Sequence, residues 1–121
     1  MLNCLCVGIG GFFGSVLRYL IGLIPVNPSN GFPVKTLVIN VLGAFVLGLI
    51  SAIAAKNSHM SEQLTLMLKV GLCGGFTTFS TFAYETTSLV QNGSAGLGIT
   101  YALLSMILGV AAVVFAQMII S

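Results

Sequence analysis

Four apolar stretches, each long enough to cross a lipid bilayer, occupy most of this chain. A membrane-spanning helix needs about 20 consecutive apolar residues. The hydropathy pattern predicts such helices over residues 2–24, 34–55, 64–90 and 95–120. The sequence therefore predicts an all-α membrane protein, with residues 1–121 forming a single transmembrane domain of four helices.

Charged side chains are too few to cover a water-facing surface. They make up 5% of the chain, whereas soluble domains carry roughly 25%. The net charge of +2 gives no basic patch, so a nucleic-acid partner is not expected. His59 is the single histidine, it lies in a predicted connection, and the chain has no Asp to orient it. We therefore expect a multi-pass membrane protein and not an enzyme.

The third stretch is the least regular of the four. It is longer than a bilayer requires, and its middle holds Gly74 and Gly75 followed by Thr77 and Thr78. Glycine and β-branched residues lower helix propensity, so we expect the helix to open between Gly74 and Thr78. Backbone that leaves a helix inside a membrane must be buried in protein or line an aqueous cavity. The break is thus a candidate ion site, with a kink tolerated for packing as the alternative.

Polar side chains set into the apolar stretches are candidates for that site. Arg18 either snorkels to the interface or biases a pathway toward anions. The Asn40 amide either pairs with another helix or donates to a passing anion. Tyr101 and Ser105, one turn apart, either extend a track of donors or bond back to their own helix. Glu85 either gates or binds a cation, or it is an exposed carboxylate at the end of a span.

Phenylalanine recurs at every third position after the glycines, at Phe76, Phe79 and Phe82. Such a stripe is ordinarily packing. An aromatic ring is positive at its edge, however, so an edge-on Phe in a narrow passage can attract a small anion without a charge that would trap it. Ser80 and Thr81 add hydroxyl donors between Phe79 and Phe82.

Lysine and arginine divide evenly between the two ends of the predicted bundle. Lys56 and Lys69 lie toward the end with both termini, and Arg18 and Lys35 lie toward the other. Because this balance sets orientation, the sequence predicts insertion in both directions and an antiparallel homodimer. Polar connections are expected at residues 25–31 and 56–63, with Ser61 as an N-cap. Small residues spaced four apart predict close helix packing, notably Gly10, Gly14, Gly22, Gly48, Gly71, Gly75 and Gly109.

Together these residues resemble the Fluc or CrcB family of small four-span fluoride channels. The resemblance rests on Gly10, Gly11, Gly14, Arg18 and Tyr19 in the first span, Asn40 and Gly43 in the second, and GLCGGFTTFSTF over residues 71–82 in the third. It implies a fluoride-selective channel that passively exports cytoplasmic fluoride across the bacterial inner membrane and confers fluoride resistance. It also implies an antiparallel, dual-topology homodimer with two pores, surrounded by lipid.

The resemblance further implies roles for individual residues. Phe79 and Phe82 would be the paired pore aromatics, Asn40 a donor beside them, and Arg18 a polar residue near the pore entrance. Tyr101 and Ser105 would belong to a polar track on the fourth span; Ser80 and Thr81 complete the predicted pore set.

A sodium ion at the dimer centre is a further implication of the resemblance. Carbonyl oxygens of Gly74 and Thr77 from both chains would hold it as a structural ion. Phe76 stands where the family is expected to carry a smaller aliphatic residue, which leaves open whether it narrows the vestibule.

Two other classes of membrane protein compete with the channel interpretation. Small multidrug exporters have a similar length, but they carry a membrane-embedded Glu in the first span, where this chain has Arg18 and no acid before Glu62. A non-conducting structural subunit would explain the packing faces but not the broken third span.

Overall fold

Four long helical segments form the fold in the computed structural model, which describes residues 1–26, 28–57 and 59–121. Asn27 and Ser58, in the two predicted connections, lie outside the described residues. The elements are α1 (Leu2–Gly22), α2 (Val34–Lys56), α3 (Glu62–Leu66), the π-helix η1 (Met67–Cys73), α4 (Gly74–Phe76), α5 (Phe79–Gln91) and α6 (Ala95–Ile120). All four segments are long and apolar enough to cross a membrane. The predicted all-α fold of four spans with a broken third helix is confirmed.

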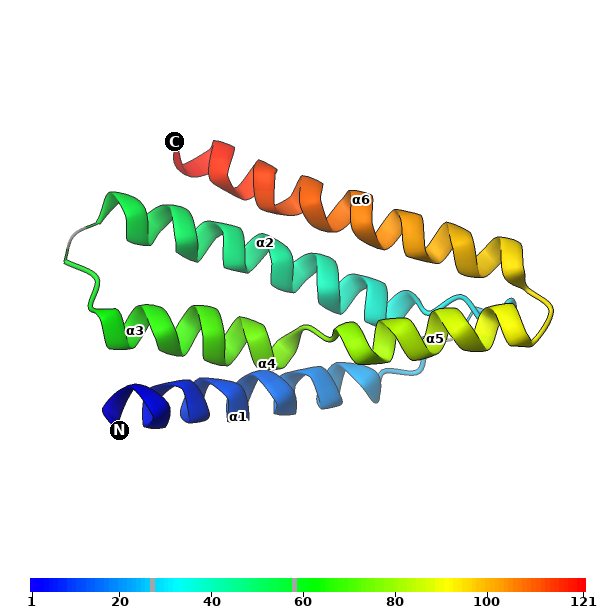
Figure 1. Ribbon diagram of the computed structural model, residues 1–121, viewed down its shortest axis with the longest axis horizontal. Helices are drawn as coiled ribbons and strands as arrows, with labels where there is room; N and C mark the ends of the chain where they lie inside the picture. The colour runs from blue at the N-terminus through cyan, green and yellow to red at the C-terminus, as the bar shows by residue number, and fades with distance from the viewer. Residues whose placement is uncertain (27, 58) are drawn as a thin grey trace.

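The elements from α3 to α5 form one nearly continuous rod, which lies beside α1 (Figure 1). Helix α2 packs mainly against α6, α1 packs along η1 and α4, and α5 packs against α6. Both termini and the connection from α2 to α3 lie at one end of the bundle (Figure 1). The connections from α1 to α2 and from α5 to α6 lie at the other end. We call it the pocket end, because the pocket described below begins there.

Backbone meets backbone where α1 crosses the third segment. A Cβ added to Gly10 would overlap the Met67 carbonyl oxygen and would lie 2.8 Å from the Leu72 nitrogen. The predicted close packing is therefore confirmed at this contact, because only glycine leaves room for the neighbouring backbone. Gly14, Gly71 and Gly75 are similarly crowded by backbone, and a Cβ on Gly48 would come within 3.0 Å of α6, whereas one on Gly22 or Gly109 would meet nothing within 4 Å in this chain.

Side chains cap several helix ends. The Ser61 hydroxyl accepts the Leu64 N–H at 3.1 Å, as the sequence predicts. At the pocket end, the Lys35 ammonium donates to the carbonyl of Gly22, the last residue of α1 (2.9 Å), and to that of Ile24, two residues beyond the helix (3.2 Å). Such cations stabilise a helix C-terminus by satisfying its free carbonyls and by opposing its dipole.

Candidate ion-binding site

The third segment loses its helical geometry at Thr77 and Thr78, which we call the break. Thr77 (φ −80°, ψ 157°) and Thr78 (φ −147°, ψ 119°) are both extended. The break lies inside the range that the sequence predicts. The Thr77 N–H and hydroxyl still reach back to the Cys73 carbonyl, at 3.0 and 2.9 Å. Beyond Thr77 the helical ladder is interrupted in the middle of a membrane span.

Two N–H groups that would close an unbroken helix are diverted at the break. The Thr78 N–H would bond the Gly74 carbonyl four residues earlier, but it donates to Asn40 Oδ1 at 2.8 Å. The Thr81 N–H would bond the Thr77 carbonyl, but it donates to the Thr78 hydroxyl at 3.2 Å. Neither the Gly74 nor the Thr77 carbonyl thus receives the N–H that it would accept in an unbroken helix. These two oxygens are therefore free to take another partner.

The chemistry of these two oxygens fits a small alkali cation. Uncharged carbonyl oxygens are the ligands that channels use to replace the hydration shell of such ions. The described part of the chain holds no cluster of three or more His, Cys, Asp or Glu that could bind a metal ion. Gly74 is exposed on the surface of this chain, so its carbonyl lies where a second copy could add further ligands.

Asn40 ties α2 to the break. Its Nδ2 donates to the Thr78 carbonyl at 3.1 Å, and its Oδ1 accepts the Thr78 N–H. One side-chain amide thus satisfies both backbone groups of a residue that has left the helix. The structure therefore places Asn40 in an interhelical bond, and an amide that donates once through Nδ2 has a second N–H to offer.

Helix α5 begins at the break, so its free N–H groups and the positive end of its dipole lie within the span. The rings of Phe79 and Phe82 lie 5.9 Å apart, and Phe82 packs against Tyr101 at 5.2 Å. The Phe79 side chain is 80% exposed, and the adjacent Ser80 is exposed as well. The structure brings the two phenylalanines together, with Phe79 exposed in this chain and Phe82 half-buried against Tyr101.

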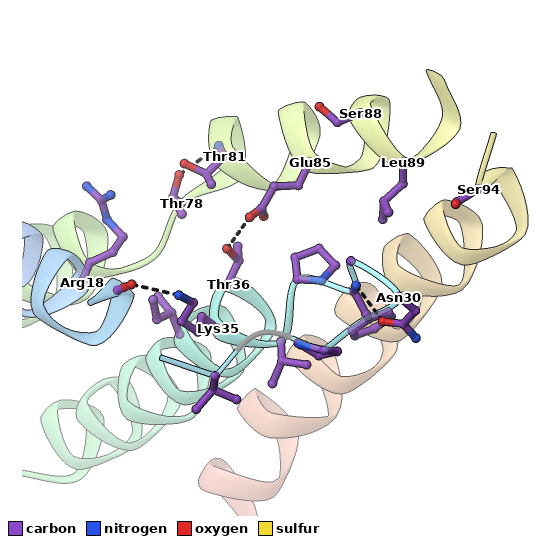
Figure 2. Close-up of a pocket in the computed structure, with 18 of the residues that line it drawn as sticks. Arg18, Asn30, Lys35, Thr36, Thr78, Thr81, Glu85, Ser88, Leu89 and Ser94 are labelled. Carbon is purple, nitrogen blue, oxygen red and sulfur yellow. Dashed lines mark hydrogen bonds between the residues drawn. The ribbon is translucent and has the colours of Figure 1, made fainter. Parts of the chain in front are cut away.

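A pocket of about 720 Å³ reaches from the pocket end of the bundle to the break. Figure 2 shows Thr78, Thr81 and Glu85 along one side of it, across from Thr36 and Lys35 on α2. The wall thus carries hydroxyl groups that lead from the mouth toward the first turn of α5.

Two cations lie in the wall of this pocket. Lys35 is held by the end of α1, as described above. Arg18 is half-buried, and its Nε donates to the Gly75 carbonyl at 3.3 Å. The side chain of Arg18 therefore reaches to the backbone just before the break. The pocket holds one carboxylate, Glu85, against these two cations, which gives its wall a net positive charge.

Glu85 joins three elements through hydrogen bonds that sequence reasoning did not anticipate. Its carboxylate accepts the Thr36 hydroxyl and the Tyr101 hydroxyl, each at 3.0 Å. Tyr101 is fully buried, with the Phe32 ring edge-on at 5.5 Å. Glu85 is therefore not an exposed carboxylate at the end of a span, and the Tyr101 hydroxyl is engaged by it. Thr36 could have been suspected from its place one turn before Asn40 on the same helix.

Ser105 differs from the other hydroxyl residues in the helices. Thr86, Thr87 and Thr100 donate to carbonyls of their own helices at 2.8–2.9 Å. The Ser105 oxygen is buried and has no hydrogen-bond partner among the residues that the structure describes. It lies one turn beyond Tyr101 and is the part of the predicted polar track that has a donor to spare.

Phe76 is buried and lies against Gly43, where an added Cβ would come within 3.2 Å of its ring. The residues that line the pocket do not include it. Phe76 therefore fills the space between the third segment and α2, and it does not narrow this pocket.

Comparison with known proteins decides the family. The family model described as CrcB-like protein, camphor resistance, matches residues 5–117. The chain belongs to the CrcB family. Three relatives carry the name fluoride-specific ion channel FluC. The one from Chlorobaculum tepidum is 48% identical over 95 residues, 78% of this chain and 75% of that protein. The one from Ruminiclostridium cellulolyticum is 42% identical over 120 residues, 98% of this chain and 92% of that protein.

The third relative, from Agrobacterium fabrum, is 40% identical over 114 residues, which cover 93% of this chain and 91% of that protein. The resemblance drawn from residues 71–82 is thereby confirmed at the level of the family. With four membrane-spanning segments, this member of the CrcB family is a multi-pass membrane protein.

Proposed function

We propose that this chain is a fluoride-selective channel that lets cytoplasmic fluoride leave the cell passively and so confers fluoride resistance. The observation that carries the proposal is the break, because it starts α5 within the membrane with Phe79, Ser80 and Thr81 in its first turn. That turn offers N–H groups, hydroxyls and ring edges, and it contains no cationic side chain. Channel sites must replace the water of an ion without holding the ion too tightly to leave. Uncharged donors meet this requirement, and the activity is conduction and not catalysis.

The pocket supplies the approach to that turn. Arg18 and Lys35 place two positive charges on its wall against the one carboxylate of Glu85, and a cleft of net positive charge raises the local concentration of anions. From there Thr81 and the second N–H of Asn40 lead to the paired phenylalanines. Fluoride is the smallest halide and is strongly hydrated, so a selective passage must replace its lost water with several donors at once; amide, hydroxyl and aromatic edges supply them without holding the ion too tightly.

A second copy of the chain, inserted in the opposite direction, completes the pathway in this proposal. Gly74, Phe79 and Ser80 are exposed in one chain, at the depth where the third segment is unwound. Irregular backbone at membrane depth is tolerated only where protein covers it or water reaches it. A two-fold symmetric pair places the same patch of both copies face to face. The even division of Lys and Arg supports both orientations, and symmetry then gives two pores.

In this dimer the Gly74 and Thr77 carbonyls of both copies would hold one sodium ion. When bound, the ion supplies positive charge that neutralises carbonyl dipoles converging from two breaks. The protein holds it with backbone oxygens alone, which the diversion of the Thr78 and Thr81 N–H groups has freed.

Efflux from liposomes tests the proposed function. Purified protein is reconstituted into vesicles loaded with potassium fluoride or potassium chloride. A potassium ionophore lets K⁺ leave with the anion, so that no opposing membrane potential builds up. We expect rapid fluoride efflux without a proton gradient and little chloride efflux from matched vesicles. Retention of fluoride would contradict the proposal, and efflux that requires a pH gradient would indicate an exporter.

A further inference from the structure

We propose that Arg18 is a positioning residue that fixes the shape of the break through its Nε–H, and not primarily through its charge. The inference rests on the proposed function in one respect: it assigns Arg18 to the cation site formed by the freed carbonyls. The juxtaposition that carries it is the hydrogen bond from Nε to the Gly75 carbonyl, across 57 positions of sequence.

The Gly75 carbonyl needs a donor from outside its own helix. In a regular helix it would accept the N–H of Phe79. The two extended residues of the break separate Gly75 from Phe79, the first residue of α5. A carbonyl left without a donor inside a membrane is costly, and Arg18 supplies the missing one.

Close packing holds α1 where the Arg18 side chain can reach the Gly75 carbonyl. One turn before Arg18, Gly14 packs so closely that an added Cβ would overlap the Leu72 carbonyl oxygen and lie 2.9 Å from the Phe76 nitrogen. The backbone of α1 and the segment that ends at the break are therefore in direct contact. The half-buried Arg18 side chain therefore has a short path to the Gly75 oxygen.

Together with Asn40, Arg18 thereby determines which carbonyls around the break already have a hydrogen-bond donor. The Gly75 oxygen is occupied by the Nε–H, and the Thr78 oxygen is occupied by Asn40. The oxygens of Gly74 and Thr77 have lost the N–H groups that they would accept in an unbroken helix and remain for a cation, and the Phe76 oxygen between them is not occupied by Arg18 or Asn40 either. Without its donor, the Gly75 carbonyl would be free to turn toward the cation or toward the N–H groups at the start of α5. Either change would alter the peptide planes that carry the two free oxygens.

If Arg18 acted through its charge alone, it would weaken cation binding at these carbonyls instead of supporting it. A guanidinium group beside these carbonyls repels a cation bound to them. Removing the charge while keeping the donor should therefore leave the cation site intact or strengthen it. Removing the donor should weaken the site.

Two neutral variants of the same length separate these effects. In Arg18→Gln the amide nitrogen is bonded to Cδ, as Nε is in arginine, so a donor stays at the same position along the side chain. Arg18→Met has no donor there. Both variants lose the charge, so a role through charge predicts that they behave alike.

Hydrogen–deuterium exchange of the purified dimer, read on peptides covering residues 74–82, reports the shape of the break through the Thr78 and Thr81 N–H groups. Losing a hydrogen bond from a charged donor should speed this exchange at least about tenfold in Arg18→Met, and Arg18→Gln should stay within about fivefold of wild type. Peptides covering residues 106–118 of α6 should be unaffected in both. Sodium titrations of the dimer's thermal stability should show a higher midpoint concentration for Arg18→Met alone.

Equal exchange in the two variants, or a sodium midpoint raised as much by Arg18→Gln as by Arg18→Met, would overturn the inference. Neither readout depends on conduction. If wild-type vesicles release fluoride and the variants are alike, the role of Arg18 fails while the channel stands. If wild-type vesicles retain fluoride and the variants differ, the proposed function fails while the role of Arg18 stands.

Discussion

The contact between α1 and the third segment predicts that alanine changes the free energy of unfolding in opposite directions at two glycines of α1. Gly10 is buried, and a Cβ there would lie 2.8 Å from the Leu72 nitrogen, where ordinary contacts begin at 3.4 Å. It would also overlap the Met67 carbonyl oxygen, so backbone and not a flexible side chain must yield. Overpacking of this kind costs up to about 3 kcal/mol. The better helix propensity of alanine offsets up to about 1 kcal/mol of this cost, so Gly10→Ala should lower the free energy of unfolding by about 2 kcal/mol.

Gly8 is the matched control, because it is exposed on the same helix and an added Cβ would meet nothing within 4 Å. Gly8→Ala should gain up to about 1 kcal/mol from helix propensity alone. The two variants should therefore differ by about 3 kcal/mol in free energy of unfolding. Titration with sodium dodecyl sulfate in mixed micelles, followed by circular dichroism, measures the difference. Equal midpoints for the two variants would refute the backbone contact on which the placement of the break depends.

Four further variants test individual contacts of the site. Phe79→Ile and Phe82→Ile should each reduce fluoride efflux about tenfold with an unchanged gel-filtration profile, because the ring edge is lost; near-normal efflux in both would contradict the aromatic role. Asn40→Leu leaves both backbone groups of Thr78 unpaired and should lower the free energy of unfolding by at least about 2 kcal/mol, read by detergent titration. Tyr101→Phe removes one of the two described donors to Glu85 and should cost about 1–2 kcal/mol, whereas an unchanged midpoint would show that the bond contributes nothing.

The features that sequence predicts well are those with a local physical cause. The four spans follow from the length of the apolar stretches, since the bilayer imposes that length. The break follows from Gly74, Gly75, Thr77 and Thr78, because each of these residues weakens the helix where it stands. The Ser61 cap is equally local, since a serine bonds an N–H three residues along the chain.

The partners of the polar residues could not be predicted in the same way. Arg18 bonds a carbonyl 57 positions away, and Glu85 meets Thr36 only because three helices converge. A single sequence contains the donors and acceptors but not the packing that pairs them. The π-helical winding of η1, which packs along α1, has no evident signal in its residues.

The orientation of the chain in the membrane tests most directly the central claim that two oppositely inserted copies meet at the break. A protease-cleavable tag placed after Ser121 is exposed to protease added outside sealed membrane vesicles only in copies whose C-terminus faces outward. We predict two populations of equal size, one cleaved and one protected, because each antiparallel dimer contains one copy of each orientation. Cleavage of all copies, or of none, would contradict the account.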